Sequence, residues 1–275
     1  MENLKRITKE IKETRNENNN NGLKKALKEY DDSLEKYIPV LMAEANIYWI
    51  KEDYPAVEKL FRNTADYCSV HDTWRLNYAH TFFVQDDKYM ECIQYYERIL
   101  ERNPSTMLEL PAILIANLCV SYIMINENPK AEEIIKTLEE FELRSTEENP
   151  EKPLFHQCIV NLVIGTLYCS KGNYDFGVGR IIKSFDPINR KLSTDTWFYA
   201  KRCLLSMMER MVKHMVSNPG PIPDKLMVEV LDFLESCEKF GKKIRSDQNP
   251  LEHEGELMVS DEARLIRRMI IKIKD

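Results

Sequence analysis

The sequence predicts an all-α protein built from helix–turn–helix repeats. Three observations support this. No segment of the 275 residues has the apolar–polar alternation of a half-buried strand. Four of the eight glycines lie between Gln157 and Phe185, where two apolar segments flank the turn SKGN. Similar pairs of apolar segments recur upstream at irregular intervals. A series of helical hairpins that share their apolar faces explains all three observations.

The glycine-rich stretch gives the repeat its register. When Gly165 is counted as position 8 of a 34-residue unit, Tyr168 falls at position 11, Tyr174 at 17 and Gly177 at 20. This is the spacing of a tetratricopeptide repeat (TPR). Positions 8 and 20 lie where the two helices of a unit cross most closely, so only small side chains fit there. The sequence therefore predicts a TPR α-solenoid in which Gly165, Tyr168, Tyr174 and Gly177 pack the repeat.

The same register can be counted three more times upstream. Units begin at residues 38, 73 and 112, before the glycine-rich unit at 158, so the starts are 35, 39 and 46 residues apart. The first three units carry Ala45, His80 and Cys119 at position 8. Because the spacing is uneven, we expect the extra length to lie in loops such as residues 144–153.

Residues 1–36 are predicted to form leading helices joined by an Asn-rich loop at 17–22. Leu4, Ile7 and Ile11 form an apolar stripe on the first of these helices. Terminal repeats usually present a polar outer face. We therefore expect this stripe to lack a covering repeat, as in an incomplete wall of a larger binding tube.

Residues 37–241 are predicted to form an irregular TPR superhelix of about five helix pairs. Proline removes a backbone donor and clashes with the preceding turn, so Pro39 is expected to start or kink a helix. The fifth pair is off-pattern, with a proline-rich break at 218–223. Residues 242–275 are expected to form a loop and a C-terminal capping helix.

Composition narrows the choice of partners and compartment. The formal net charge of −6 and the pI near 5.6 argue against nucleic acid or an anionic membrane as the main partner. The seven cysteines form no CxxC pair, which favours a reducing compartment. Residues 110–125 are an uncharged run of 16, shorter than the roughly 20 residues that span a bilayer. We expect no membrane insertion.

No residue pattern has the spacing of a catalytic, metal or cofactor site. The five histidines include no HExxH pair. The GVG at 177–179 lacks the third glycine and the preceding strand of a nucleotide-binding loop. We therefore expect a non-enzymatic protein without a metal or a cofactor.

The binding surface expected of a TPR array is the concave face made by the first helix of each unit. Aromatic rings and amide side chains there suit an extended proline-rich ligand, which stacks on rings and leaves carbonyls in need of donors. Aromatic residues at helical spacing are more often core residues, and this tendency weighs against Trp74, Tyr78 and Tyr199, the first choices for the groove. The candidate groove residues are Asn46, Trp49, Trp74, Asn77, Tyr78, Asn117, Phe198, Tyr199 and Arg202.

Longer strings resemble one family of TPR proteins. They are YIPVLMAEANIYW (37–49), ANLCVSYIM (116–124), CIVNLVIGTLYCSKGNYDFGVGRIIKS (158–184) and TDTWFYAKRCLLS (194–206). They closely resemble the tetratricopeptide-repeat protein 30 family, also called the fleer or intraflagellar transport protein 70 family. The match runs essentially from end to end and corresponds to the C-terminal part of the family, which carries further repeats upstream. The Asn-rich loop, the proline-rich break and the C-terminal tail depart from it.

The resemblance implies a subunit of intraflagellar transport complex B, needed to build and maintain cilia. Such a subunit resides in the cilium or flagellum and in the cytoplasm around the basal body. In this family the superhelix encloses a proline-rich segment of intraflagellar transport protein 52, and members are linked to the heterotrimeric kinesin and to tubulin polyglutamylation. The alternative is a free-standing peptide-binding adaptor or co-chaperone that clamps a terminal carboxylate. Such a clamp needs basic residues beside asparagine, and Asn77 and Asn117 have none on the same faces.

Overall fold

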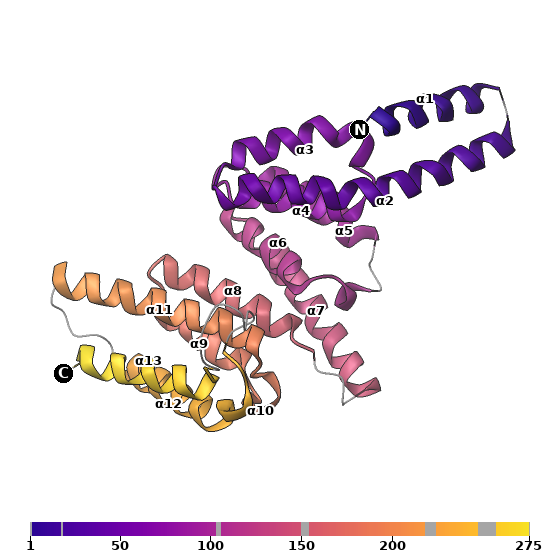
Figure 1. Ribbon diagram of the computed structural model, residues 1–275. Coiled ribbons are helices and arrows are strands. Elements are labelled where there is room, and N and C mark those ends of the chain that lie inside the picture. Colours follow the sequence, from indigo (N-terminus) through magenta and orange to yellow (C-terminus); the bar gives the residue numbers. More distant parts are fainter. Residues whose placement is uncertain are drawn as a thin grey trace. The chain divides into compact units, whose positions relative to one another are not determined.

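The computed structural model describes residues 2–17, 19–102, 106–149, 154–217, 224–246 and 257–274 (Figure 1). These residues form thirteen α-helices and two short 3-10 helices, and their only extended pairing is an isolated antiparallel bridge between Arg245 and Met258. The predicted all-α class is confirmed. The chain divides into two compact units, Met1–Pro104 and Ser105–Asp275, and each is described by itself.

The first unit consists of five helices in which each packs against the next along the chain. They are α1 (Glu2–Asn16), α2 (Asn20–Ile50), α3 (Tyr54–Cys68), α4 (Asp72–Phe83) and α5 (Tyr89–Arg102). The longest is α2, and α1 runs back along its first half (Figure 1).

The apolar stripe of α1 is covered, contrary to expectation. Leu4 is 2% exposed and Ile7 is fully buried, because α1 folds back on α2, which contributes the buried Ala26. The prediction of an uncovered stripe is therefore wrong, because α2, the next helix along the chain, covers it.

The helix α2 runs without interruption through Pro39. Proline costs least where the carbonyl that it leaves unpaired can be hydrated, and Pro39 is exposed while Ile38 and Leu41 are buried. The prediction that Pro39 starts a helix is wrong for this reason, and the boundary predicted at residues 36 and 37 falls inside α2. The Asn-rich loop is also shorter than predicted, since α2 begins at Asn20.

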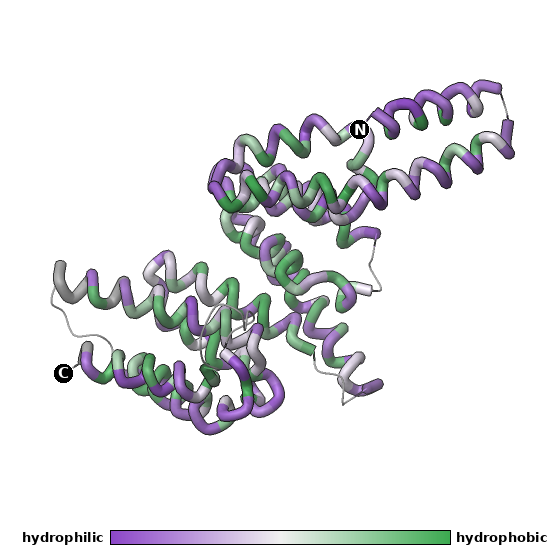
Figure 2. Tube along the Cα trace, viewed as in Figure 1, coloured by the Kyte–Doolittle hydropathy of each residue, from purple (hydrophilic) through white to green (hydrophobic). Residues whose placement is uncertain are grey.

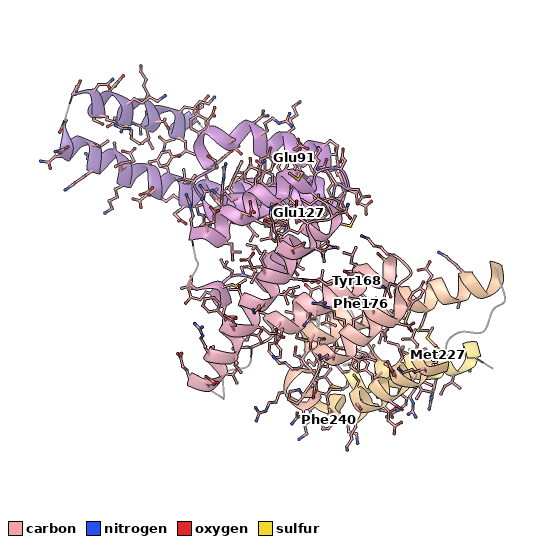
Figure 3. The ribbon with its side chains drawn as sticks, turned by 180° about the vertical axis from the view of Figure 1, so that it is seen from behind. Glu91, Glu127, Tyr168, Phe176, Met227 and Phe240 are labelled. Atoms are coloured by element: carbon pink, nitrogen blue, oxygen red, sulfur yellow. The ribbon has the colours of Figure 1, made fainter. Side chains whose placement is uncertain are left out.

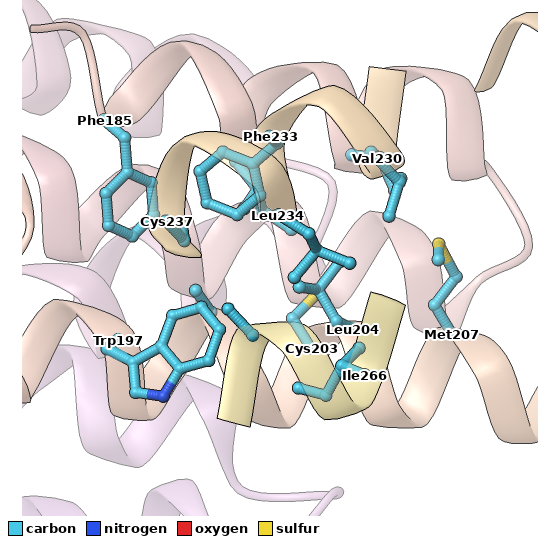
Figure 4. Close-up of a cluster of buried hydrophobic side chains, with 14 of the residues drawn as sticks. Phe185, Trp197, Cys203, Leu204, Met207, Val230, Phe233, Leu234, Cys237 and Ile266 are labelled. Carbon is cyan, nitrogen blue, oxygen red and sulfur yellow. The ribbon is translucent and has the colours of Figure 1, made fainter. Parts of the chain in front are cut away.

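The second unit contains the remaining helices. They are η1 (Met107–Glu109), α6 (Ala112–Met124), α7 (Asn128–Glu148), α8 (His156–Ser170), α9 (Tyr174–Ser184), α10 (Ile188–Lys191), α11 (Thr194–Ser217), α12 (Asp224–Phe240), η2 (Gly241–Lys243) and α13 (Val259–Lys274). In α6 the uncharged run is buried on nearly all sides, and its tube is mostly green in Figure 2. The helices α8, α9, α11, α12 and α13 enclose one apolar core, with Trp197, Phe185 and Phe233 among its largest members (Figure 4).

Three hairpins share one turn. Glu52, Asn126 and Gly172 have positive φ angles of 57°, 64° and 86°, and each stands at position 15 of the predicted register. The next residue donates its backbone N–H to the carbonyl of the tyrosine at position 11. These bonds are Asp53 to Tyr48 (3.1 Å), Glu127 to Tyr122 (2.8 Å) and Asn173 to Tyr168 (2.9 Å). A left-handed residue followed by this bond is a common helix ending, so the register corresponds to a repeated local geometry.

The extra length of the third unit lies in a helix rather than a loop. The helix α7 continues to Glu148, so residues 144–148 of the predicted loop 144–153 are helical, and residues 150–153 lie outside the described residues. The proline-rich break at 218–223 lies outside them as well, as does most of the loop predicted before the last helix.

Candidate peptide-binding pocket

A pocket of about 340 Å³ opens on the first unit between α2, α3 and α4. Nine residues line it: Met42, Ala45, Asn46 and Trp49 from α2, Val57 and Phe61 from α3, and Asn77, His80 and Thr81 from α4. Three of them, Asn46, Trp49 and Asn77, belong to the predicted groove. The structure therefore brings together these three predicted residues, which come from the first helices of two successive units.

The local sequence fixes the walls of this pocket. Met42, Asn46 and Trp49 are spaced by four and three residues, so they share one face of α2. The ring of Trp49 stands edge-on to Tyr54 at the start of α3, with centroids 5.2 Å apart. Asp53 caps α3 by accepting the backbone N–H of Ala56 at 3.1 Å. The turn thus positions α3 and the indole ring together.

The polar groups of the pocket are neutral. Asn46 is exposed and makes no side-chain hydrogen bond with the described residues. Asn77 donates its Nδ2 to the carbonyl of Thr73 at 2.8 Å. Nδ1 of His80 lies 2.6 Å from the hydroxyl of Tyr96, and burial lowers the pKa of His80 from 6.5 to about 4. The imidazole is therefore uncharged near neutral pH.

This arrangement suits an uncharged segment of polypeptide. Ala45, Val57 and Phe61 supply a buried apolar floor, and Trp49 supplies an aromatic wall that a proline ring can stack on. Asn46 offers both a donor and an acceptor at the rim. None of the nine lining residues is a lysine, arginine, aspartate or glutamate, so the pocket has no charged group to pair with a terminal carboxylate.

Trp74 and Tyr78 are core residues of the first unit. Trp74 is 1% exposed and donates its Nε1 to Oγ1 of Thr64 at 3.0 Å. Tyr78 is 5% exposed and lies 5.4 Å from the ring of Phe61, nearly parallel to it. The prediction that these two line an open groove is therefore wrong: they turn toward α3 and α5, where an aromatic cluster encloses them.

The remaining groove candidates belong to the second unit and differ in exposure. Asn117 is buried in α6 at 6% exposure. On α11, Phe198 and Tyr199 are half-buried with ring centroids 5.5 Å apart, and the guanidinium of Arg202 lies 5.5 Å from the Phe198 ring. Asn117 therefore offers no open surface, whereas the three residues of α11 form a partly exposed aromatic–cationic group.

The four residues assigned to repeat packing come together around the α8–α9 hairpin. A Cβ atom on Gly165 would lie 2.8 Å from the carbonyl oxygen of Gly177, and one on Gly177 would lie 2.6 Å from the carbonyl oxygen of Gly165. The two backbones thus meet directly. Tyr168 stands edge-on to Phe176 with centroids 4.6 Å apart (Figure 3), and Tyr174 packs on the apolar core.

Sequence reasoning missed the role of His80 in the pocket. The repeat register could have indicated this role. His80 occupies position 8, where the other units carry the small residues alanine, cysteine and glycine. A large polar residue at a helix crossing needs a partner, and Tyr96 at position 24 provides it. The lack of metal-ligand spacing among the histidines says nothing of this role, and the repeat position of His80 is the stronger signal.

Other features of the described residues bear on the class of protein. All seven cysteines lie among them, each is buried, and none forms a disulfide bond with another of these residues. Within the same part of the chain, no group of three or more His, Cys, Asp and Glu side chains is placed to hold a metal ion. No helix there has both the length and the apolar character needed to cross a membrane.

Comparison with known proteins gives a match over the whole chain. The family model of the intraflagellar transport protein 70 C-terminal domain matches residues 1–275. Intraflagellar transport protein 70A of Bos taurus is 49% identical over 279 residues, covering 100% of this chain and 41% of the relative. The corresponding Danio rerio and Homo sapiens proteins are 49% and 48% identical over 277 residues, covering 99% of this chain and 42% and 41% of the relatives. The chain thus spans about two-fifths of the length of these relatives.

The fold and the pocket define a class: an all-α protein of successive helical hairpins with an uncharged pocket on the first helices of two of them. Within that class, the chain belongs to the family of the intraflagellar transport protein 70 C-terminal domain. The resemblance seen in the longer sequence strings is confirmed.

Proposed function

We propose that the chain is a non-catalytic TPR scaffold subunit of intraflagellar transport complex B, required for cilium assembly and maintenance. The observation that carries this proposal is the family match across all 275 residues, together with 48–49% identity to proteins named for intraflagellar transport. The shared turn at position 15 supports the TPR assignment, because it recurs in three hairpins at the predicted register. On this proposal the protein resides in the cilium and in the cytoplasm around the basal body.

The chief partner on this proposal is the proline-rich segment of intraflagellar transport protein 52. The pocket between α2, α3 and α4 is the contact that we assign to it within the first unit. Its uncharged lining, the half-buried ring of Trp49 and the exposed amide of Asn46 match the needs of a proline-rich chain, which has rings to stack and carbonyls without donors. The partly exposed group of Phe198, Tyr199 and Arg202 is a second candidate contact. The heterotrimeric kinesin is a further proposed partner.

The alternative class is a free-standing peptide-binding adaptor or co-chaperone. A carboxylate clamp needs lysine or arginine side chains that converge with asparagine on the ligand. The pocket has two asparagines, Asn46 and Asn77, but no lysine or arginine among its lining residues. This absence favours the scaffold proposal over the adaptor.

Two measurements test the proposal. In the first, the tagged chain is purified from ciliated cells and the proteins that accompany it are identified by mass spectrometry. We expect complex B subunits in stoichiometric amounts, whereas recovery of chaperones alone would support the adaptor. In the second, titration calorimetry measures binding of a synthetic peptide with the proline-rich sequence of intraflagellar transport protein 52.

Variants of the pocket make the second measurement specific. Trp49→Ala removes the aromatic wall and should weaken peptide binding about tenfold, as loss of a central aromatic contact commonly does. Asn46→Lys places a long side chain at the rim without disturbing the core, because Asn46 is exposed. The matched control is Phe240→Ala, which removes an aromatic ring that is 42% exposed in the second unit. Equal binding by all four proteins would contradict the assigned contact.

A further inference from the structure

Gly179 in α9 is a glycine that the packing of the described residues does not explain. Six glycines lie in this part of the chain, and at five of them a side chain would either clash or, at Gly172, require a left-handed backbone. A Cβ atom on Gly179 would meet no atom within 4 Å, and its φ is not left-handed. Glycine is among the poorest helix formers. A glycine that weakens its helix and faces open space indicates that something else approaches the backbone there.

Two hollows flank α9 and meet at this glycine. One, of about 680 Å³, is lined mainly by α7, α8 and α9, with Lys191 of α10 at its edge. The other, of about 490 Å³, is lined by α9, α10 and α12. Gly179, Lys183 and Asp186 line both. Gly179 and Lys183 are four residues apart and share one face of α9, and Asp186 follows the end of the helix. Of these three residues, Gly179 is the one without a side chain between the hollows.

The geometry limits the kind of ligand that could use this surface. A ligand that enters both hollows must cross a helix whose diameter with side chains is about 10 Å. An extended polypeptide advances about 3.3 Å per residue, so about three or four residues make the crossing. Because Gly179 has no Cβ, the main chain of such a segment can come close to the helix backbone there.

The chemistry of the smaller hollow selects the side chains of that segment. Ile182, Ile188 and Phe233 give it an apolar surface, and its charged lining residues are three acids and one lysine. Two of the acids, Asp186 and Asp232, are exposed, and neither forms an ion pair within the described residues. Carboxylates beside an apolar surface favour a lysine or arginine, whose stem packs on the apolar side chains while its charge meets the acids.

In the larger hollow, the residue next to Gly179 is already paired. Arg180 donates its Nε to Oδ1 of Asn161 at 2.8 Å, and its guanidinium lies 5.8 Å from the ring of Phe176. Its guanidinium is therefore already held in place by neighbouring side chains of the chain. Beside the crossing, this hollow offers the flat face of an arginine and an aromatic ring, which suit the uncharged part of a peptide.

We propose that the surface across α9 binds an extended segment of a partner polypeptide, with a small residue over Gly179 and a lysine or arginine at Asp186 and Asp232. The site is distinct from the pocket of the first unit, and its elements are the second helices of two hairpins together with α8, α10 and α12. A second copy of this chain is the competing occupant.

A peptide selection tests this site. A random 12-residue library displayed on phage is selected against the 275-residue chain, and the recovered peptides are measured by fluorescence anisotropy. We expect peptides with a lysine or arginine next to small or apolar residues. Their affinity should fall at least tenfold with Gly179→Leu, which blocks the crossing, and with Asp232→Lys, which reverses a charge at the edge.

The controls distinguish binding across α9 from binding elsewhere on the chain. Glu133→Leu places the same side chain on an exposed position of α7 outside both hollows and should leave affinity within twofold. Trp49→Ala should also leave it unchanged, so failure of the pocket proposed in the first unit would be seen separately. Gly179→Leu should not lower the thermal midpoint of the chain, because its side chain enters open space and leucine is a better helix former than glycine.

Several outcomes would overturn the proposal. Selection of no peptide, selection of acidic peptides, or equal binding by the Gly179→Leu protein would each do so. Sedimentation provides a further check: self-association of the chain that Gly179→Leu abolishes would assign the surface to a second copy instead of a different partner.

Discussion

Two hairpins of the same register make the closest contact between their helices with different atoms. In α8–α9, positions 8 and 20 are Gly165 and Gly177, and the two backbones touch. In α4–α5, the same positions are His80 and Cys92, and the contact is made by side chains. There His80 reaches Tyr96 at position 24 through a hydrogen bond of 2.6 Å. Position 24 thus faces position 8 in both hairpins, as Ile181 faces Gly165.

The difference shows what the repeat register requires and what it leaves open. The register fixes which positions face each other, but the volume at the crossing can come from backbone or from side chains. In α8–α9 the helices touch through their backbones, and side chains of both helices belong to the large apolar core of the second unit. Side-chain contact in α4–α5 places a polar ring at the crossing, and that ring lines the pocket of the first unit.

The largest effect is expected from filling the glycine crossing. Gly165→Leu should lower the free energy of unfolding by about 3 kcal/mol, since overpacking a close contact forces the helices apart. Even the first added atom would lie 2.6 Å from Cγ1 of Ile181 and 2.8 Å from the carbonyl oxygen of Gly177. Urea unfolding measures the loss. Hydrogen exchange should show that protection falls first in residues 156–184, and unchanged protection there would contradict the backbone contact.

The same crossing explains what could be predicted from the sequence. Gly165 and Gly177 revealed the register because glycine inside a helix needs a reason. In the structure, Glu52, Asn126 and Gly172, the left-handed residues of three turns, all fall at one position of that register. Helix boundaries were harder to predict from the sequence. A proline usually starts or kinks a helix, but Pro39 is exposed, and this exposure makes the lost hydrogen bond tolerable inside α2. The exposure depends on how α2 packs, which the sequence pattern does not show.

The candidate site was only partly predictable for a similar reason. Asn46, Trp49 and Asn77 were found because concave positions follow from the register. Trp74 and Tyr78 occupy similar positions but turn into an aromatic cluster with Phe61. Which way a large side chain points depends on the room between helices, and that room is set by tertiary packing and not by spacing along the chain.

The second effect is a pH dependence that the α4–α5 crossing should have and the α8–α9 crossing should lack. Burial lowers the pKa of His80 in the folded chain from 6.5 to about 4. Between these pH values the unfolded chain binds the proton and the folded chain does not, so stability falls as the pH drops below 6.5. The loss between pH 7 and pH 5 should be about 2 kcal/mol, measured by urea unfolding at each pH.

A glutamine at this position supplies the control, because its side chain does not titrate. In His80→Gln, the loss of stability between pH 7 and pH 5 should be smaller than in the unaltered chain. The difference between the two losses should be about 2 kcal/mol, the part that His80 contributes. If the two proteins lost stability in parallel over this range, His80 would not be the group responsible.

A smaller effect is expected from the hydrogen bond at the histidine crossing. Tyr96 is fully buried, and Tyr96→Phe keeps its ring while removing the hydroxyl that meets Nδ1 of His80. The cost should be about 1 kcal/mol, the usual value for one buried hydrogen bond. Tyr67→Phe is the comparison, since Tyr67 makes no side-chain hydrogen bond within the described residues. Equal thermal midpoints for both variants would show that the crossing depends on ring packing alone.

The smallest effect has the opposite sign and separates glycines that the fold needs from one that it does not. Gly179→Ala adds a Cβ that would meet no atom within 4 Å, and it replaces the poorest helix former but proline by the best. It should therefore raise the free energy of unfolding by about 0.5–1 kcal/mol.

Gly177→Ala, two residues earlier in the same helix, is the matched control. Its Cβ would lie 2.6 Å from the carbonyl oxygen of Gly165 and 2.5 Å from Sγ of Cys169, so the gain in helix propensity should be outweighed and the protein destabilised. Urea unfolding of the two variants side by side measures both signs. A loss of stability in Gly179→Ala would mean that this glycine, too, is required by the packing of its own chain.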